Sequence, residues 1–229
     1  AMLGVGESGV KDRIILNIRL PKTLTAVFVG AALGISGAVF QSVSRNALGS
    51  PDVIGFTTGA ATGAIAQIIL FNQGALEVAL AAIFGGLVTA VVVYLLAVKV
   101  GVVGGYRLIL TGIGIGSILS ALNGLMLVKG NLDSAIMANL WLAGSLHART
   151  WMHVYPVLLG VVLLLPIMTV LKRALVMIEM GDDIATQLGI RVERVRLSMI
   201  FFAVVLAAFA TGAAGPIAFI ALAAPQLVS

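Results

Sequence analysis

The feature that most constrains this chain is an uncharged apolar run over residues 23–43. The run has about the 20 residues that a helix needs to cross the hydrocarbon core of a bilayer. Many of its side chains are small: Gly30, Ala31, Ala32, Gly34, Ser36, Gly37 and Ala38. Helices in lipid associate where small residues let their backbones approach, because lipid tails are as apolar as the side chains. We therefore expect a membrane helix inside a bundle, with few lipid contacts.

Composition extends this expectation to the whole chain. Of its 229 residues, 60% are hydrophobic and 10% are charged, and the mean hydropathy is +1.14. A soluble domain carries roughly a quarter charged residues. The chain has no cysteine, which excludes disulfides and thiolate metal sites. The net charge of +5 does not indicate nucleic-acid binding, because the basic residues are scattered at the ends of apolar runs.

We predict an all-α fold, a polytopic transmembrane helix bundle that forms one domain over residues 1–229. Six full spans are expected, at about residues 24–43, 53–71, 76–98, 108–128, 152–171 and 197–214. Residues 1–18 are short and polar, and their apolar part is too brief to cross a membrane. Residues 130–150 are too polar to cross, and their tryptophan favours a position along the membrane surface. The last piece, from residue 215, is broken by two prolines and predicts the start of an interrupted element.

Basic residues favour cytoplasmic loops, and this bias gives a weak indication of orientation. If the loop after the first span is cytoplasmic, successive loops lie alternately inside and outside the membrane. Six basic residues then lie on the outer side and eight on the inner side. The eight on the inner side are then Arg45, Lys99, Arg107, Lys172, Arg173, Arg191, Arg194 and Arg196.

The order of residues around the first two spans is more specific than their composition. Arg-Leu-Pro-Lys stands at residues 19–22, Arg-Asn-Ala-Leu-Gly-Ser-Pro at 45–51, and Ile-Gly-Phe-Thr-Thr-Gly-Ala at 54–60. This order resembles the FecCD/BtuC-type permeases, the membrane subunits of ABC importers for ferric siderophores, haem and vitamin B12. The family usually has Arg where Lys22 stands and Pro where Ala47 stands. Residues 107–114 and 141–146 look most like ferric-enterobactin-type permeases.

The resemblance implies a permease of ten spans, of which this chain lacks the first and the last few. It implies transport of a ferric siderophore across the bacterial cytoplasmic (inner) membrane, with vitamin B12 or haem as the alternative within the family. The implied partners are cytoplasmic ABC ATPase subunits, a periplasmic or lipid-anchored substrate-binding protein, and a second permease copy or paralogue. No cofactor is expected on this chain, since ATP-Mg would bind the partner ATPases, and no nucleic acid is expected.

Other classes of function find little support in the residues. The chain has no Walker A, HExxH or GxSxG motif and no acid pair within a span, so we do not expect an enzyme. Few ionisable groups lie within the spans, which argues against a proton-coupled carrier, and no selectivity-filter sequence is evident. An ATP-independent secondary transporter or channel is the alternative of another class.

Residues 179–196 are the most charged part of the chain. Two carboxylates suit a helix N-terminus, two apolar residues three apart share a face, and a glycine suits the helix end. This pattern fits an ordinary charged loop or a short surface helix. The resemblance favours the helix, as the coupling element that docks onto the ATPases. Its implied residues are Asp182, Asp183, Ala185, Leu188, Gly189 and Arg191.

Arg19 and Lys22 flank a proline at the predicted outer entrance to the first span. Basic residues at helix ends commonly extend toward the interface, and that role would suffice here. In the family, basic residues of this motif accept acidic residues of the substrate-binding protein. Charge complementarity of that kind sets register and encounter rate more than affinity.

One face of the fourth span contains small and polar residues: Gly116, Ser117, Ser120 and Asn123. They either form hydrogen bonds between helices within the bundle or, as the resemblance implies, line the translocation path between two permease copies.

Gly215, Pro216, Pro225 and Gln226 belong to the interrupted element at the end of the chain. They resemble a Gly-Pro motif of the family, although Ala221 replaces its usual glycine. Broken helices in membrane proteins mark backbone that lines a cavity or moves, so we expect a gating role, with a static kink as the alternative.

Overall fold

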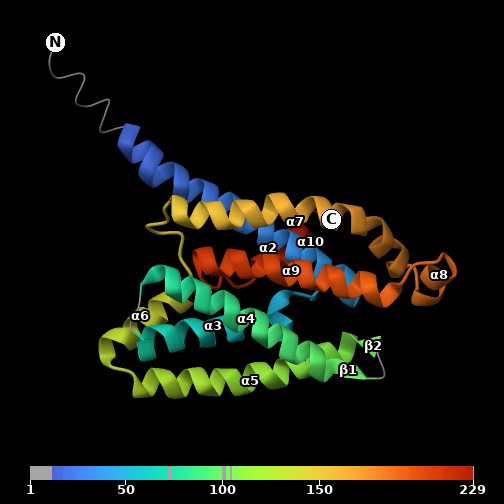
Figure 1. Cartoon of the computed structure of the whole chain (residues 1–229), viewed down its shortest axis with the longest axis horizontal. Coiled ribbons are helices and arrows are strands. Elements are labelled where there is room, and N and C mark those ends of the chain that lie inside the picture. Colours follow the sequence, from blue (N-terminus) through green and yellow to red (C-terminus); the bar gives the residue numbers. More distant parts are fainter. Residues whose placement is uncertain (1–11, 72–73, 100–101, 104, 229) are drawn as a thin grey trace, which may run out of the picture.

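A computed structural model describes residues 12–71, 74–99, 102–103 and 105–228 as an elongated bundle of helices (Figure 1). Its described residues contain only one pair of strands, in which β1 (Val98–Lys99) pairs antiparallel with β2 (Val102–Val103). The predicted all-α fold class is therefore confirmed. Figure 1 places β1 and β2 at the same end of the bundle as α8 (Asp182–Gln187), and α6 (Leu132–Leu142) at the other. We call these the α8 end and the α6 end.

The centre of the bundle is formed by α2 (Leu20–Ser44) and α9 (Val192–Ala214), with α7 (Trp151–Glu179) and α10 (Ile220–Val228) against α2. The most apolar stretch of α9 is 67% buried, more than that of any other span. Alanine and glycine dominate the second half of α9, so its backbone can approach α2 closely. The buried Ser36 hydroxyl donates a hydrogen bond of 2.8 Å to the carbonyl of Ala203, which joins the two helices directly.

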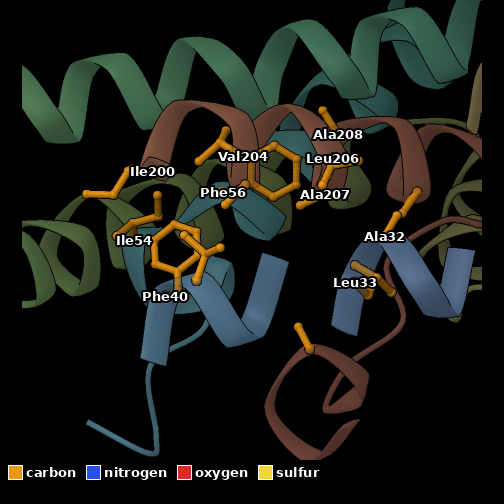
Figure 2. Close-up of a cluster of buried hydrophobic side chains, with 14 of the residues drawn as sticks. Ala32, Leu33, Phe40, Ile54, Phe56, Ile200, Val204, Leu206, Ala207 and Ala208 are labelled. Carbon is orange, nitrogen blue, oxygen red and sulfur yellow. The ribbon is translucent and has the colours of Figure 1, made fainter. Parts of the chain in front are cut away.

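Larger side chains fill the space where α2, α9 and the start of α3 (Phe56–Ala66) meet. Figure 2 shows Phe40 from α2 beside Ile54, with Ile200 and Val204 from α9 around them. Phe56, the first residue of α3, is 1% exposed in the same cluster. Burial of these rings fixes the path of the chain between α2 and α3.

A second layer packs α3 against α4 (Ala75–Ala97), with α5 (Gly105–Lys129) beside them. Glycines stand where α3 and α4 cross: a Cβ on Gly59 would lie 2.8 Å from the carbonyl oxygen of Gly85, and one on Gly63 would lie 2.1 Å from that of Ala81. Such close approach is typical of small-residue crossings between membrane helices. By contrast, the most apolar stretch of α5 is only 17% buried, so most of α5 faces away from the bundle.

The structure corrects the bounds of the first two predicted spans. Within the described residues, the first helix extends from Asp12, before the predicted start, to Ser44 and includes the π-helix η1 (Ile15–Arg19). The second is shorter, because the 3-10 helix η2 (Pro51–Ile54) occupies its expected start. It comprises α3 and the π-helix η3 (Gln67–Phe71), a continuous apolar helix over Phe56–Phe71. Five described helices are thus long and apolar enough to cross a membrane, and this sixth is shorter.

Residues 130–150, predicted to lie along the surface, contain the short helix α6. The Asn131 side chain caps it by accepting a 2.8 Å hydrogen bond from the Ser134 amide. Ser134 and Ala138 face the bundle, while Leu132 and Leu140 are 75% and 68% exposed. The helix therefore packs through small side chains and presents large apolar ones outward.

Replacement of Gly37 by alanine should destabilise the protein. The new Cβ would lie 1.6 Å from the carbonyl oxygen of Ala221, so α10 must move, and overpacking of this kind costs about 1–3 kcal/mol. Gly30→Ala is the matched control, because nothing lies within 4 Å of the position that its new methyl group would occupy. The thermal midpoint of the purified full-length protein should fall for Gly37→Ala and hold or rise for Gly30→Ala. Equal midpoints would contradict this packing.

Candidate functional site

The α8 end contains the short helix predicted from residue 182. α8 follows Gly181, which has a φ of 138°, and the chain turns after it at Gly189, which has a φ of 81°. Left-handed values of this kind favour glycine, so both turns depend on these residues. The next helix, α9, begins at Val192. The predicted short helix is therefore present, and a turn and a second helix follow it.

Asp182 does not cap α8, contrary to the expectation from its position. Its carboxylate instead accepts two hydrogen bonds of 3.1 Å from the guanidinium of Arg196 and one of 2.5 Å from that of Arg45. Partial burial alone would raise the pKa of Asp182, but the bonds and charges of Arg196 and Arg45 outweigh it and hold that pKa below its usual value. Asp182 is therefore ionised at physiological pH.

We use the name Asp182 cluster for four charged residues at the α8 end: Arg45, Asp182, Glu193 and Arg196. Besides its bonds to Asp182, Arg196 places its Nη1 atom 3.7 Å from a Glu193 oxygen. Arg45 comes from the end of α2, and 137 residues separate it from Asp182. Sequence analysis assigned no site role to Arg45 or Arg196, because no local spacing indicates a pair so distant along the chain.

The predicted common face of Ala185 and Leu188 is not present. Ala185 is fully buried under α8, whereas Leu188 is 62% exposed. Met180 and Ile184 are also exposed, at 70% and 48%, and with Leu188 they form what we call the α8 surface. The charged side chains of Asp183 and Arg191 are exposed in the same segment. This end of the molecule therefore offers apolar side chains among charges, on a helix whose first residue is fixed by two arginines.

A groove of about 520 Å³ runs between α5 and the start of α3. Gly116, Ser117 and Ser120 line it, as do Asp52 and Thr58 from the opposite wall. The Asp52 carboxylate accepts a hydrogen bond from the Thr57 hydroxyl. Sequence analysis assigned no role to Asp52, which precedes the second predicted span.

Asn123 lies outside this groove, unlike its predicted companions. It is 8% exposed, and its Oδ1 atom has no hydrogen-bond partner within the described part of the chain. Ser117 instead donates to the carbonyl of Ile113, one turn earlier in its own helix. Asn123 lies seven residues, or about two turns, after Gly116 and therefore on nearly the same side of α5, but at a level where the bundle buries it.

Arg19 and Lys22 are both exposed, three residues apart on one continuous helix, and so share a face. Pro21 lies between them and is buried. In a π-helix such as η1, each carbonyl accepts a hydrogen bond from the N–H five residues later, but proline has no N–H. The Leu16 carbonyl therefore receives no bond from residue 21. The Trp151 indole supplies that hydrogen bond, at 3.1 Å. This bond places the two cations close to the start of α7.

The interrupted element has the expected break. α9 ends at Ala214, the chain turns over residues 215–219, and α10 continues through Pro225. A Cβ on Gly215 would lie 2.8 Å from the Trp141 carbonyl oxygen, which shows how closely this turn packs on the end of α6. Gln226 donates to the Gln41 side chain at 2.8 Å, and Gln41 donates to the Leu222 carbonyl at 3.0 Å. The break is thus tied to α2.

Comparison with known proteins identifies the family. The profile of the FecCD transport family matches residues 2–229. The chain belongs to the FecCD transport family. Among relatives of this FecCD chain, the ferric enterobactin transport system permease protein FepG of Escherichia coli is 48% identical over 93% of the chain and 64% of its own length. The cobalamin import system permease protein BtuC of Halobacterium salinarum is 34% identical over 100% of the chain and 62% of its own length.

A solved structure of a metal-chelate type ABC transporter in an inward-facing conformation has a TM-score of 0.89 to this FecCD chain, with 29% identity. The match covers 96% of this chain and 70% of that one. The chain spans less than two thirds of the length of the two relatives named above, FepG and BtuC. Its apolar helices and its family together make it a multi-pass membrane protein.

Cysteine labelling should distinguish the groove from the bundle interior, because the 229 residues contain no cysteine of their own. Ser120→Cys, at an exposed position of the groove, should react with a water-soluble thiol reagent. Asn123→Cys, on the same helix but buried, should react more slowly by about tenfold or more, since thiol reactivity requires access. The measurement is the labelling rate of purified full-length protein after subtraction of the rate of the unsubstituted full-length protein, and equal rates would contradict the assigned positions.

Proposed function

We propose that the full-length protein is the permease subunit of an ABC importer that carries a ferric siderophore across the bacterial cytoplasmic membrane. The match to the FecCD family and the name of the 48% identical relative support this substrate class. Vitamin B12 is the second candidate, favoured by the 34% identity to a cobalamin import permease over the whole chain.

The α8 surface is the single observation that carries the proposed mechanism. A transporter without an energy source of its own must accept movement from a partner, and α8 presents exposed Ile184 and Leu188 at one end of the bundle. An apolar helix face of this kind fits a groove on a partner protein. We propose that cytoplasmic ABC ATPase subunits, with ATP-Mg bound, dock there, with Asp183 and Arg191 at the rim. ATP hydrolysis then belongs to these partners.

The opposite end supplies the second docking site of the proposal. Arg19 and Lys22 are exposed beside the start of α7, where a periplasmic or lipid-anchored substrate-binding protein would bring acidic residues. Gly116, Ser117 and Ser120 would line the translocation path on the outward face of α5, against a second permease copy or paralogue. Buried Asn123 is better suited to a role inside the bundle. The broken element with Gly215, Pro216, Pro225 and Gln226 would move in gating.

Replacement of Gly189 by arginine should abolish uptake of radiolabelled ferric siderophore in cells that carry the full-length protein. Position 189 directly follows Leu188 of the α8 surface and has open space around it, so a long charged side chain there would hinder docking of the ATPase, and the φ of 81° would add backbone strain. Gly189→Asn is the matched control, because asparagine tolerates a positive φ and is small and uncharged.

We expect the Gly189→Arg protein to insert into the membrane but to lose co-purification with the ATPase, and the Gly189→Asn protein to keep both uptake and partner. If Gly189→Arg leaves uptake and co-purification unchanged, α8 is only a connecting segment and the proposal fails.

A further inference from the structure

Arg45 joins three elements at the α8 end. It ends α2 in the left-handed conformation, with a φ of 49°, which is uncommon for a residue with a side chain. Its guanidinium donates to the carbonyl of Ile178, near the end of α7, and to Asp182, the first residue of α8. One side chain therefore connects the end of α2 to the corner between α7 and α8.

Asp182 is also bonded to α9. Arg196 donates twice to its carboxylate, and the Arg196 side chain is only 12% exposed. Both bonds come from Nη2 of Arg196 and end on the two oxygens of the carboxylate, so they hold it from the side of α9. A displacement of α8 must therefore either break these bonds or carry the end of α2 with it.

Residue 45 also begins the loop that leads to α3 and contacts α5 on the way. The Asn46 amide donates to the Gln41 carbonyl, and Asn46 in turn accepts from the amides of Leu48 and Gly49, so the loop folds back tightly on the end of α2. At its far end the loop touches α5, where a Cβ on Gly112 would lie 2.4 Å from the Val53 carbonyl oxygen.

Between these two contacts lies a cavity of about 580 Å³. The charged side chains of Arg45, Asp182 and Arg196 line one side of it, and Leu108 and Ile113 of α5 lie on another. The loop is therefore bonded to α8 at its start, through Arg45, and packed at its end, where Pro51 and Ile54 are buried, and the cavity leaves space beside Leu108 and Ile113.

We propose that Arg45 is a positioning residue that makes α8 and the loop over residues 46–54 move as one unit, so that a push on α8 shifts the loop against α5. The inference rests on the proposed function, because it concerns how ATP-driven movement reaches the proposed translocation path. A shared displacement of this kind is a coupling between two sites, and its loss is expected to separate hydrolysis from transport.

The first test compares uptake with ATP hydrolysis in proteoliposomes that contain the complete transporter. Arg45→Gln should keep hydrolysis but lower the amount of ferric siderophore taken up per ATP by about fivefold or more, the range of ordinary allosteric couplings. Arg45→Lys, which keeps the charge, should retain most of this ratio. Asp182→Asn should behave like Arg45→Gln, and it keeps the inference testable if the first variant does not assemble. Arg173→Gln, an exposed cation of α7 outside the Asp182 cluster, is the matched control.

A second test restores the connection by chemistry. The Arg45→Cys/Asp182→Cys pair should be uncoupled when reduced, and a short bifunctional thiol reagent that joins the two cysteines should restore uptake per ATP. A purely structural role would lower hydrolysis and uptake together, and the ratio would not change, which would overturn the inference. Cross-linking that blocks uptake would also overturn it, because the pair would then have to separate during transport. If the unmodified transporter shows no ATP-dependent uptake, the proposed function itself fails.

Discussion

Close approach of α2 to its neighbours is the contact on which the rest of the structure depends. Lipid offers neither a hydrophobic drive between helices nor hydrogen-bond partners for the backbone, so a bundle forms through tight packing and a few interhelical bonds. Gly37 lies against the backbone of α10, and Ser36 donates to the backbone of α9. A larger side chain at either position would separate α2 from one of the two helices that position the broken element.

This central helix also connects the two ends of the molecule. At one end, Arg19 directly precedes it and Lys22 lies in its first turn, beside the Trp151 indole that donates to the Leu16 carbonyl. At the other it ends at Arg45, bound to α8 through Asp182. Peripheral α5, by contrast, keeps most of its surface away from the bundle and forms one wall of the groove. A closely packed centre with one exposed wall would suit the proposed translocation path, which must open and close.

Apolar run length predicted the bundle and most of its helices because the thickness of the bilayer sets the length of a spanning helix. The start of the first helix was missed, since residues 14–16 are too few to indicate a span by themselves, although they belong to the continuous helix over Asp12–Ser44. Gly189 predicted the end of α8 correctly, because a positive φ is a local requirement. Spacing could not decide whether Ala185 or Leu188 faces inward, since tertiary packing determines how a short helix is rotated. The pairing of Arg45 with Asp182 depends on the fold of the whole chain, and no pattern within a few residues indicates it.

The most direct test of the account is uptake of ferric siderophore into proteoliposomes that contain the full-length permease, its ATPase and its substrate-binding protein. With ATP on the α8 side, uptake should proceed and should persist when ionophores collapse every ion gradient. It should stop when a non-hydrolysable analogue replaces ATP. Uptake that needs no ATP and ceases on addition of the ionophores would contradict the account and favour a secondary transporter.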